Sequence, residues 1–335
     1  MEHTQAIDPG AHDGRSGSMQ FPRQLIPPVV AGLLVMLALL GFIGTAIRDP
    51  RPHAIPVGLV GPGQAVQQIT TAFGANAPGA FAFTSYSSEP DAIAALDSRA
   101  VDGVLILGPS PRLVVSGAAG DAETGVITAA FTNMLKAQGA TVTVATVHAF
   151  AAGDAHGLIL FFVVVAVIVS ALVTQAVLLT TANATGFAAR LTVVVVFALL
   201  AGLTGMGTAA WIAGDYGPGF WSATGIVILA SAAIGAVVAG SARLLGTAGL
   251  GLAALVVVLL DLVSSGGPVG SQLLPDFYRA IAPWMPAGTL YSGMRGALYF
   301  GGAGTGGPIV VLTAWLAVGI VLLWLGGLRS RATNR

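Results

Sequence analysis

Six long apolar segments constrain the fold of this chain more than any other feature. A transmembrane helix needs about 20 consecutive apolar residues. Only 8% of the 335 residues are charged, whereas soluble domains carry about 25%. We therefore expect a polytopic, mostly α-helical protein in contact with a lipid bilayer. The six predicted transmembrane helices are residues 24–47, 158–181, 191–213, 224–242, 244–264 and 309–328.

The first apolar segment has two interpretations. Residues 1–23 before it are polar and lack apolar periodicity, which predicts a disordered tail. The small residues Gly44 to Ala46 could form the cleavage site of a signal peptide. The apolar core is longer than the roughly 7–15 residues of such peptides, which favours an uncleaved anchor over residues 24–47.

Residues 48–157 are less hydrophobic than the rest and alternate between strand and helix patterns. This predicts a small α/β domain inserted between the first two transmembrane helices. Its strands are expected at 55–60, 80–84, 101–107, 113–115 and 141–147, and its helices at 64–73, 89–98 and 122–138. The apolar residues at helical spacing in the helix over 122–138 are Val126, Ala130, Met134 and Ala137.

The distribution of arginine predicts the orientation in the membrane. Six spans place both termini on one side, and lysine and arginine prefer the cytoplasmic side. We therefore expect a multi-pass plasma-membrane protein with cytoplasmic tails at 1–23 and 329–335 and with residues 48–157 outside. The inner arginines are then Arg15, Arg23, Arg190, Arg243, Arg329, Arg331 and Arg335, and the outer arginines close to the membrane are Arg48, Arg51, Arg279 and Arg295.

Residues 274–302 interrupt the apolar pattern before the last span. The stretch is too polar to cross a bilayer, and its many aromatic rings are typical of the headgroup zone. Because proline breaks helices, Pro283 and Pro286, with Trp284 between them, are expected to divide it into two short helices. This predicts an interfacial or re-entrant element on the outer face. The apolar stripe expected on its second helix, facing lipid or the bundle, is Leu290, Met294, Ala297 and Leu298.

Charged residues near the outer ends of the spans are the first functional candidates. Asp261 lies in the segment 244–264, where a charged side chain at mid-membrane costs about 2.5–3.5 kcal/mol. It is therefore expected to face a substrate path or to make a local contact at the helix end. Arg279 and Arg295 are its candidate partners, and Arg295 is expected to meet headgroups, water or a carboxylate such as Asp261. The candidates for a substrate path or for its structural support are Asp261, Arg279, Trp284, Pro286, Arg295 and Tyr299.

No motif indicates an enzyme, a cofactor site or a metal site. The chain has no cysteine, lacks the G-x-S-x-G and H-E-x-x-H motifs, and its sole lysine, Lys136, is not in a Walker A loop. Asp215 and Asp261 lack the flanking residues of an intramembrane aspartyl protease. A net charge of zero with scattered arginines does not indicate a nucleic-acid partner. The residues weighed as metal ligands, and better explained as a solvated linker, are His148, Asp154 and His156.

Two stretches, together with the order of the segments, carry a resemblance to a known family. The first is LPDFYRAIAPWMPAGTLYSGMRGALYFGG at 274–302, followed by a last span that contains Trp315; the second is DSRAVDGVL at 97–105. One span, an outer domain and five further spans resemble the type-2 ABC-transporter permeases. The likeness is greatest to the phage-infection-protein (Pip)-like branch of bacterial membrane proteins, and it covers about residues 25–328.

The resemblance implies a permease-like subunit that works as a homodimer or with a related subunit. Such a subunit moves a hydrophobic or amphipathic substrate outward with a separate ABC ATPase. Inner loops meet the ATPase in that family, so Phe187 and Arg190, at the end of the loop 181–190, are the docking candidates. The chain departs from the family in that its N-terminal tail has no amphipathic helix and this loop is nearly uncharged, which favours the Pip-like branch.

A second function remains open from the sequence. The protein could be a non-transporting surface receptor or assembly scaffold that acts through its outer α/β domain. A transporter is expected to have a lateral or central cavity that reaches Asp261, whereas a scaffold needs none.

Overall fold

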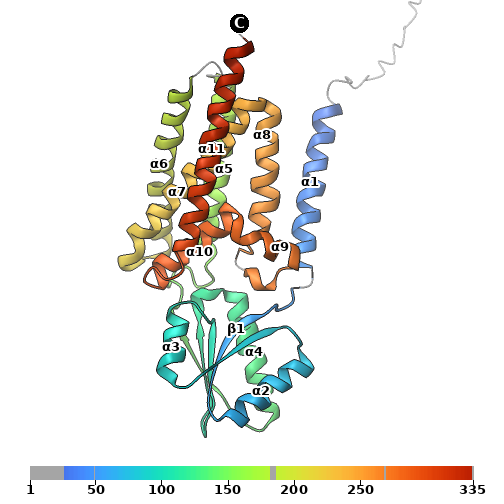
Figure 1. The fold of residues 1–335 in the computed structure, drawn as a ribbon, viewed down its shortest axis with the longest axis vertical. Helices are drawn as coiled ribbons and strands as arrows, with labels where there is room; N and C mark the ends of the chain where they lie inside the picture. Colours follow the sequence, from blue (N-terminus) through green and yellow to red (C-terminus); the bar gives the residue numbers. More distant parts are fainter. Residues whose placement is uncertain (1–25, 49, 182–185, 268, 334–335) are drawn as a thin grey trace, which may run out of the picture.

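Five of the predicted apolar segments form long helices in the computed structural model, which describes residues 26–48, 50–181, 186–267 and 269–333 (Figure 1). Each of these helices is long and apolar enough to cross a membrane. The chain is therefore mostly helical and has the composition of a multi-pass membrane protein. The five helices are α1 (Ile26–Ile47), α5 (Leu158–Thr181), α6 (Phe187–Ala213), α7 (Phe220–Leu245) and α11 (Gly306–Thr333).

The segment predicted over 244–264 forms a shorter helix. α8 (Thr247–Ala254) continues as a π-helix, η4 (Leu255–Leu262), which contains Asp261. π-Helical turns are rare and are frequent at functional sites. Because the apolar helix Thr247–Leu262 is shorter than the other five, the count of six membrane spans stays a prediction.

Helix α7 is the centre of the helical bundle. It packs against α5, α6, α10 and α11, and most of its residues are buried. A Cβ atom at Gly240 of α7 would lie 2.6 Å from the Cβ of Leu322 and 2.8 Å from backbone atoms of α11. The two helices therefore approach each other at a distance that only glycine permits at this position.

Helix α1 stands apart from this bundle (Figure 1). Its large apolar side chains are exposed over most of its length, from Ile26 to Ile43. Only its end near the sheet is anchored: Ala46 packs against Leu274 and Tyr278, and the hydroxyl of Tyr278 donates to the carbonyl of Phe42 at 3.1 Å. In a membrane, lipid would cover the rest of α1.

Residues 55–147 form a five-stranded mixed sheet with helices, here called the sheet unit, at one end of the bundle (Figure 1). The strand order is β2-β1-β3-β4-β5; β3 and β4 form an antiparallel pair and all other neighbours are parallel. The strands are β1 (Ile55–Val60), β2 (Phe81–Tyr86), β3 (Gly103–Ile106), β4 (Arg112–Ser116) and β5 (Thr143–Val147), and the helices are α2 (Gly63–Asn76), α3 (Glu89–Asp97) and α4 (Asp121–Ala137). Each predicted strand and helix of this region is confirmed within a few residues.

The buried face of α4 differs from the prediction. Of the residues predicted for its apolar face, Val126, Ala130 and Met134 are only partly buried and Ala137 is exposed. Phe131 determines the orientation, because its ring packs against Phe73 with ring centroids 4.8 Å apart, and large aromatic rings contribute more buried area than alanine or valine. The fully buried positions are Glu123, Ile127, Phe131 and Leu135.

The proline-rich stretch forms short helices between the bundle and the sheet unit (Figure 1). α9 (Asp276–Ile281) leads into a 3₁₀ turn, η6 (Ala282–Trp284), and α10 (Pro286–Tyr299) follows. The predicted division at the prolines is confirmed, and Pro286 takes the first position of α10, where a helix tolerates proline. The expected stripe faces the bundle: Leu290, Met294 and Ala297 are buried in its core and Leu298 packs against them.

Candidate functional site

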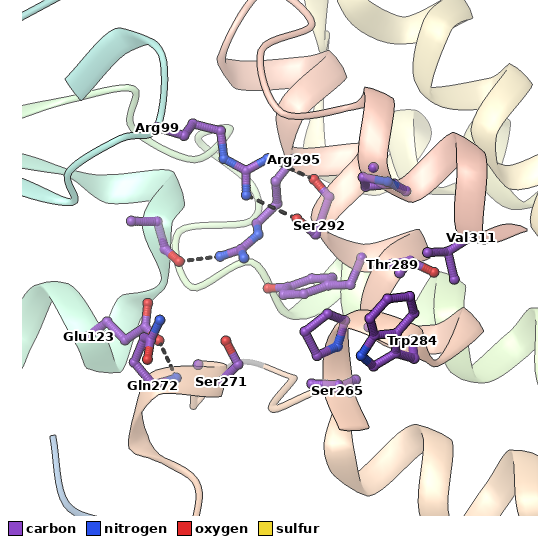
Figure 2. A pocket seen from close by; sticks show the side chains of 18 of the residues that line it. Arg99, Glu123, Ser265, Ser271, Gln272, Trp284, Thr289, Ser292, Arg295 and Val311 are labelled. Atoms are coloured by element: carbon purple, nitrogen blue, oxygen red, sulfur yellow. Dashed lines mark hydrogen bonds between the residues drawn. The ribbon is translucent and has the colours of Figure 1, made fainter. Parts of the chain in front are cut away.

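A cavity of about 670 Å³ lies where the sheet unit meets α10 and α11 (Figure 2). We call it the interface cavity. Arg99, Asp102 and Glu123 line it from the sheet unit, and Ser292 and Arg295 line it from α10. Two guanidinium groups and two carboxyl groups therefore meet in one hollow next to a predominantly apolar helical bundle.

Asp261 fixes the start of α10 and thereby one wall of the cavity. Its Oδ1 accepts a hydrogen bond from the backbone N–H of Ala287 at 2.6 Å, and the N–H of Gly288 also interacts with it. Met285, which precedes the helix, provides no capping side chain. The carboxylate of Asp261 thus caps the positive end of α10 from another helix.

Arg99 connects the sheet unit to α10. It follows α3 with a φ of 64°, a left-handed conformation that costs a non-glycine residue about 1–3 kcal/mol. Its Nη1 and Nη2 donate to the backbone carbonyl and the hydroxyl of Ser292, each at 3.1 Å, and its guanidinium lies over the ring of Phe300. Burial, and secondarily the charge of Arg295, lower the pKa of Arg99 to about 10.

Arg295 reaches from α10 into the sheet unit. Its Nη1 donates to the carbonyls of Ala118 and Ala119, and its guanidinium lies 4.8 Å from the ring centroid of Tyr291. Arg295 was predicted to meet headgroups, water or a carboxylate such as Asp261, and Asp261 is engaged instead by the N–H of Ala287. The carboxylates that act on Arg295 are instead Asp102 and Glu123, because α10 directs its polar face toward the sheet unit.

The two carboxyl groups of the cavity are strongly desolvated. Glu123 is only 4% exposed, and its Oε1 accepts a hydrogen bond from the backbone N–H of Gln272 at 2.9 Å. A Cβ atom at Gly270 would lie 2.5 Å from the Glu123 carboxyl carbon, so the backbone approaches this group closely. Burial, and then the negative charge of Asp102, raise the pKa of Glu123 to about 7. Burial raises the pKa of Asp102 to about 6, against the opposing effect of Arg295 and then Arg99.

The other end of the cavity is apolar and opens at the surface of the bundle. Trp284 and Val310 line it and are each 68% exposed. The indole N–H of Trp315 donates to the carbonyl of Trp284 at 2.7 Å, which holds this turn against α11. The remaining apolar residues at this end are Pro283, Pro308 and Val311.

Two of the predicted candidates lie elsewhere. Arg279 lies 3.8 Å from Asp276 on the same short helix, and the prediction that it partners Asp261 is wrong because backbone N–H groups occupy that role. Tyr299 ends α10: its carbonyl lies 2.8 Å from Nδ1 of His148, and its hydroxyl accepts from the N–H of Ala151 at 3.4 Å. It therefore joins α10 to the segment that leads from the sheet unit into α5.

The candidates for an ATPase contact face the bundle interior. Arg190 is 2% exposed, and Phe187 packs with Val194, Ala236 and Leu323. Arg190 is thus not an exposed contact, whereas Phe187 is partly exposed. Residues 182–185 of the predicted docking loop lie outside the described residues, so docking through the loop stays a prediction.

The three residues weighed as metal ligands have separate partners. His148 Nε2 lies 2.8 Å from Asp97, and His156 Nδ1 lies 3.0 Å from Asp121. Asp154 accepts hydrogen bonds from the N–H groups of the first turn of α5, at Ile159 and Leu160. Across the part of the chain that the structure describes, no three His, Asp or Glu side chains are grouped to hold a metal ion.

A second hollow, of about 550 Å³, lies between α5 and α6, and we call it the α5–α6 groove. Its wall is apolar apart from the hydroxyls of Ser170, Thr204 and Thr208. The hydroxyl of Ser170 donates to the carbonyl of Ala166 in its own helix. The groove therefore offers little for polar recognition.

Sequence reasoning missed the three charged residues that the sheet unit contributes to the interface cavity. Glu123 carried a usable signal, because it stands four residues before Ile127, which lies on the same helical face as Phe131. A carboxyl group in line with the largest apolar residues of a helix is either buried or misassigned. Arg99 and Asp102 lie in the stretch quoted for the family resemblance, but nothing in their spacing shows that they face α10.

Comparisons with protein-family models, with curated proteins and with solved structures find no match to this chain.

Proposed function

We propose that the protein is a permease-like membrane component of an export system for an amphipathic molecule. The interface cavity is the observation that carries this proposal. One end of the cavity is built from two arginines and two carboxyl groups, and the other end is apolar and opens beside Trp284 and Val310 at the bundle surface. An amphipathic molecule can place its polar part in the first end and its apolar part in the second.

The position of the cavity favours access from lipid. Residues of α10 and of the first turns of α11 line the cavity. Both elements lie at the end of the bundle next to the sheet unit (Figure 1). Tryptophan prefers this depth in membrane proteins because its ring is amphipathic. The exposed ring of Trp284 then lies beside the headgroups, and the substrate enters laterally from one leaflet.

Charge supports an orientation with the sheet unit outside the cell. The end of the bundle opposite the sheet unit carries Arg190, Arg243 and Arg329, and Arg329 donates to the carbonyl of Leu244 there. In the sequence, seven arginines are expected on this side, against four, Arg48, Arg51, Arg279 and Arg295, close to the membrane on the side of the sheet unit. Basic residues are retained on the cytoplasmic side of membranes. With this orientation the interface cavity belongs to the outer leaflet.

A separate ATPase supplies the energy if the export is active, since the chain has no Walker A loop. A second copy or a related subunit would complete the permease. Both parts of the proposal rest on the likeness of segment order to the type-2 permeases.

One observation favours a non-transporting receptor or scaffold as the second candidate. The interface cavity is lined by Ser265 and Gly288 near Asp261, but Asp261 itself is fully buried and is engaged in capping α10. The cavity that a transporter was expected to extend to this carboxylate ends before it. A receptor that binds its ligand in the cavity without moving it would have this geometry.

Transport can be tested in vesicles that contain a fluorescently labelled phospholipid. The full chain is reconstituted with any nucleotide-binding subunit that co-purifies, and the transfer of label between leaflets is followed with and without ATP. Val310→Trp narrows the mouth of the cavity and is expected to reduce transfer about tenfold, whereas Ala201→Trp in the α5–α6 groove leaves it unchanged. If the label were distributed between the two leaflets in the same way with and without ATP in wild-type vesicles, the exporter would be rejected. The receptor would then be the remaining candidate function.

The orientation needs its own measurement, and the absence of cysteine makes it direct. Asn76→Cys on α2 and Thr247→Cys at the start of α8 place single thiols on exposed positions at opposite ends. A membrane-impermeant thiol reagent should label the first in intact cells and the second only after permeabilisation. The reverse pattern would contradict the proposed orientation.

A further inference from the structure

The charges of the interface cavity are separated into two walls. Arg99 and Arg295 lie together with Ser292 on the side of α10, and Glu123 lies on the opposite side near Gln272 and Ser271 (Figure 2). Asp102 also lines the cavity from the sheet unit, and its charge interacts with those of Glu123, Arg295 and Arg99. The cavity thus has a cationic wall, an anionic wall and an apolar mouth.

These charges do not neutralise one another by direct contact. Within the described residues, no guanidinium nitrogen of Arg99 or Arg295 forms an ion pair with a carboxyl oxygen of the cavity. Asp102 makes no side-chain hydrogen bond to a described residue, and Nε of Arg295 is buried without a hydrogen-bond partner there. Buried charges are normally paired, because desolvation costs more free energy than a distant opposite charge returns.

The apolar mouth excludes a small soluble ion as the best ligand. Trp284, Val310 and Val311 form a surface that an acyl chain can cover, and it is continuous with the exposed face of the bundle. A purely anionic head would satisfy the guanidinium wall and leave the carboxyl wall opposed by its own charge. A head that carries both an anion and an ammonium group satisfies both walls, since guanidinium binds phosphate and an ammonium N–H donates to carboxylates.

We propose that the interface cavity binds the head of a zwitterionic amphiphile, with its phosphate or carboxylate on Arg99 and Arg295 and its ammonium group on Asp102 and Glu123. The proposal rests on the proposed function in that it names the substrate class of the same site. It adds that recognition requires N–H donors on the ligand, which distinguishes a primary amine from a quaternary one.

Native mass spectrometry of the purified full chain provides the test. The protein is equilibrated with equal amounts of phosphatidylethanolamine, phosphatidylcholine and phosphatidylglycerol of the same acyl chains, and the lipid that survives delipidation is identified. We expect about tenfold preference for phosphatidylethanolamine over phosphatidylglycerol, because only the former donates charge-assisted hydrogen bonds to the carboxyl groups. Glycerophosphoethanolamine, the soluble head alone, is added as a competitor and should displace the lipid only at a large excess.

Three variants locate the preference. Asp102→Asn and Glu123→Gln should each reduce the preference to about twofold while phospholipid is still retained, since the guanidinium wall remains. Arg99→Gln should reduce the retention of all three lipids about tenfold. Arg112→Gln is the matched control, because Arg112 pairs with Glu89 on the exposed surface and lies outside the cavity.

The outcomes separate this inference from the proposed function. Equal retention of the three lipids by the wild-type protein would overturn the inference. This measurement needs no variant, so the inference can be contradicted even if the variants fail to fold. An unchanged preference in both folded carboxyl variants would also overturn it. If the protein preferentially retained phosphatidylethanolamine but did not transfer label in an ATP-dependent way, the head-group site would be supported and the exporter rejected. ATP-dependent transfer without a lipid preference would support the exporter and reject the head-group site.

Discussion

The interface cavity and the α5–α6 groove have similar volumes, about 670 and 550 Å³, but they are built from different chemistry. The groove separates two apolar helices, so acyl chains can fill it without recognition. The interface cavity lies where a polar sheet unit meets an apolar bundle, and it is lined by four ionisable groups, of which Glu123 is buried and Arg99, Asp102 and Arg295 are partly buried. Such groups reduce stability unless something compensates for their burial, which is why they mark a site more strongly than volume does.

The two hollows differ in chemistry because different parts of the chain line them. α5 and α6 both come from apolar segments, whereas Arg99, Asp102 and Glu123 come from the sheet unit and Arg295 from α10. Only the contact between the sheet unit and α10 places these residues together. Variants of residues at the two hollows show whether this difference in chemistry also produces a difference in the free energy of unfolding.

Arg295→Met should give the largest loss of stability. The change leaves the carbonyls of Ala118 and Ala119 without their donor and removes the positive charge that acts on Asp102 and Glu123. We expect the free energy of unfolding to fall by about 2–4 kcal/mol, because two buried carbonyls lose a charged hydrogen-bond donor. Chemical denaturation of the purified protein in detergent measures it.

Arg112→Met is the control for that experiment. Its ion pair with Glu89 is about half exposed on both sides, so the loss should be below about 1 kcal/mol. Equal losses in the two variants would show that the buried charges of the cavity contribute nothing beyond surface pairing.

The cavity should also make stability depend on pH. Folding raises the pKa of Asp102 from 3.8 to about 6 and that of Glu123 from 4.5 to about 7, so the folded state binds protons more tightly than the unfolded state. The resulting stabilisation is complete below about pH 4 and is lost as the pH rises through 6 to 7. Each group can contribute up to about 3 kcal/mol.

Denaturation of the wild-type protein and of Glu123→Gln between pH 4.5 and 8 measures this effect. The variant should lose part of the decline toward high pH, because glutamine does not ionise. A wild-type stability that rises over this range would contradict the environment described for both carboxyl groups.

The alternation of strand and helix patterns was sufficient to predict the sheet unit. The run over 55–60 was predicted to the residue, and Pro283 and Pro286 were correctly predicted to divide the stretch that contains α10. These features are local: they follow from side-chain periodicity and from the missing N–H of proline. The length of apolar runs likewise identified the five long helices.

The candidate site could be predicted only in part, because it depends on contacts between distant segments. Arg295 was identified as a candidate, but its partners come from residues 118–123, more than 170 positions away. Asp261 was identified by its charge in an apolar run, whereas its role depends on where the start of α10 lies. The face of α4 that buries Glu123 is set by Phe131 packing on the sheet, and single-sequence periodicity chose the neighbouring face.

Asp261→Ala should lower the free energy of unfolding by a smaller amount, and it should affect the interface cavity but not the α5–α6 groove. Removal of the carboxylate leaves the N–H groups of Ala287 and Gly288 without their acceptor in a buried site. We expect a loss of about 1–3 kcal/mol, and a smaller loss for Asp261→Asn, which keeps an oxygen acceptor. Hydrogen exchange should increase in α10, which lines the interface cavity, and stay unchanged in α5 and α6.

The smallest effect is expected in the α5–α6 groove. Thr208→Val replaces an exposed hydroxyl of α6 by a methyl group of nearly equal size. The free energy of unfolding should change by less than about 0.5 kcal/mol, and the ratio of retained phospholipids should not change.

The substitution is matched by Thr289→Val in the cavity wall, where the hydroxyl donates to the carbonyls of Met285 and Pro286 and valine removes that donor. The loss at Thr289 should be about 0.5–1.5 kcal/mol. If Thr208→Val altered lipid retention more than Thr289→Val, recognition would lie in the apolar groove, and the argument from desolvated charge would be wrong.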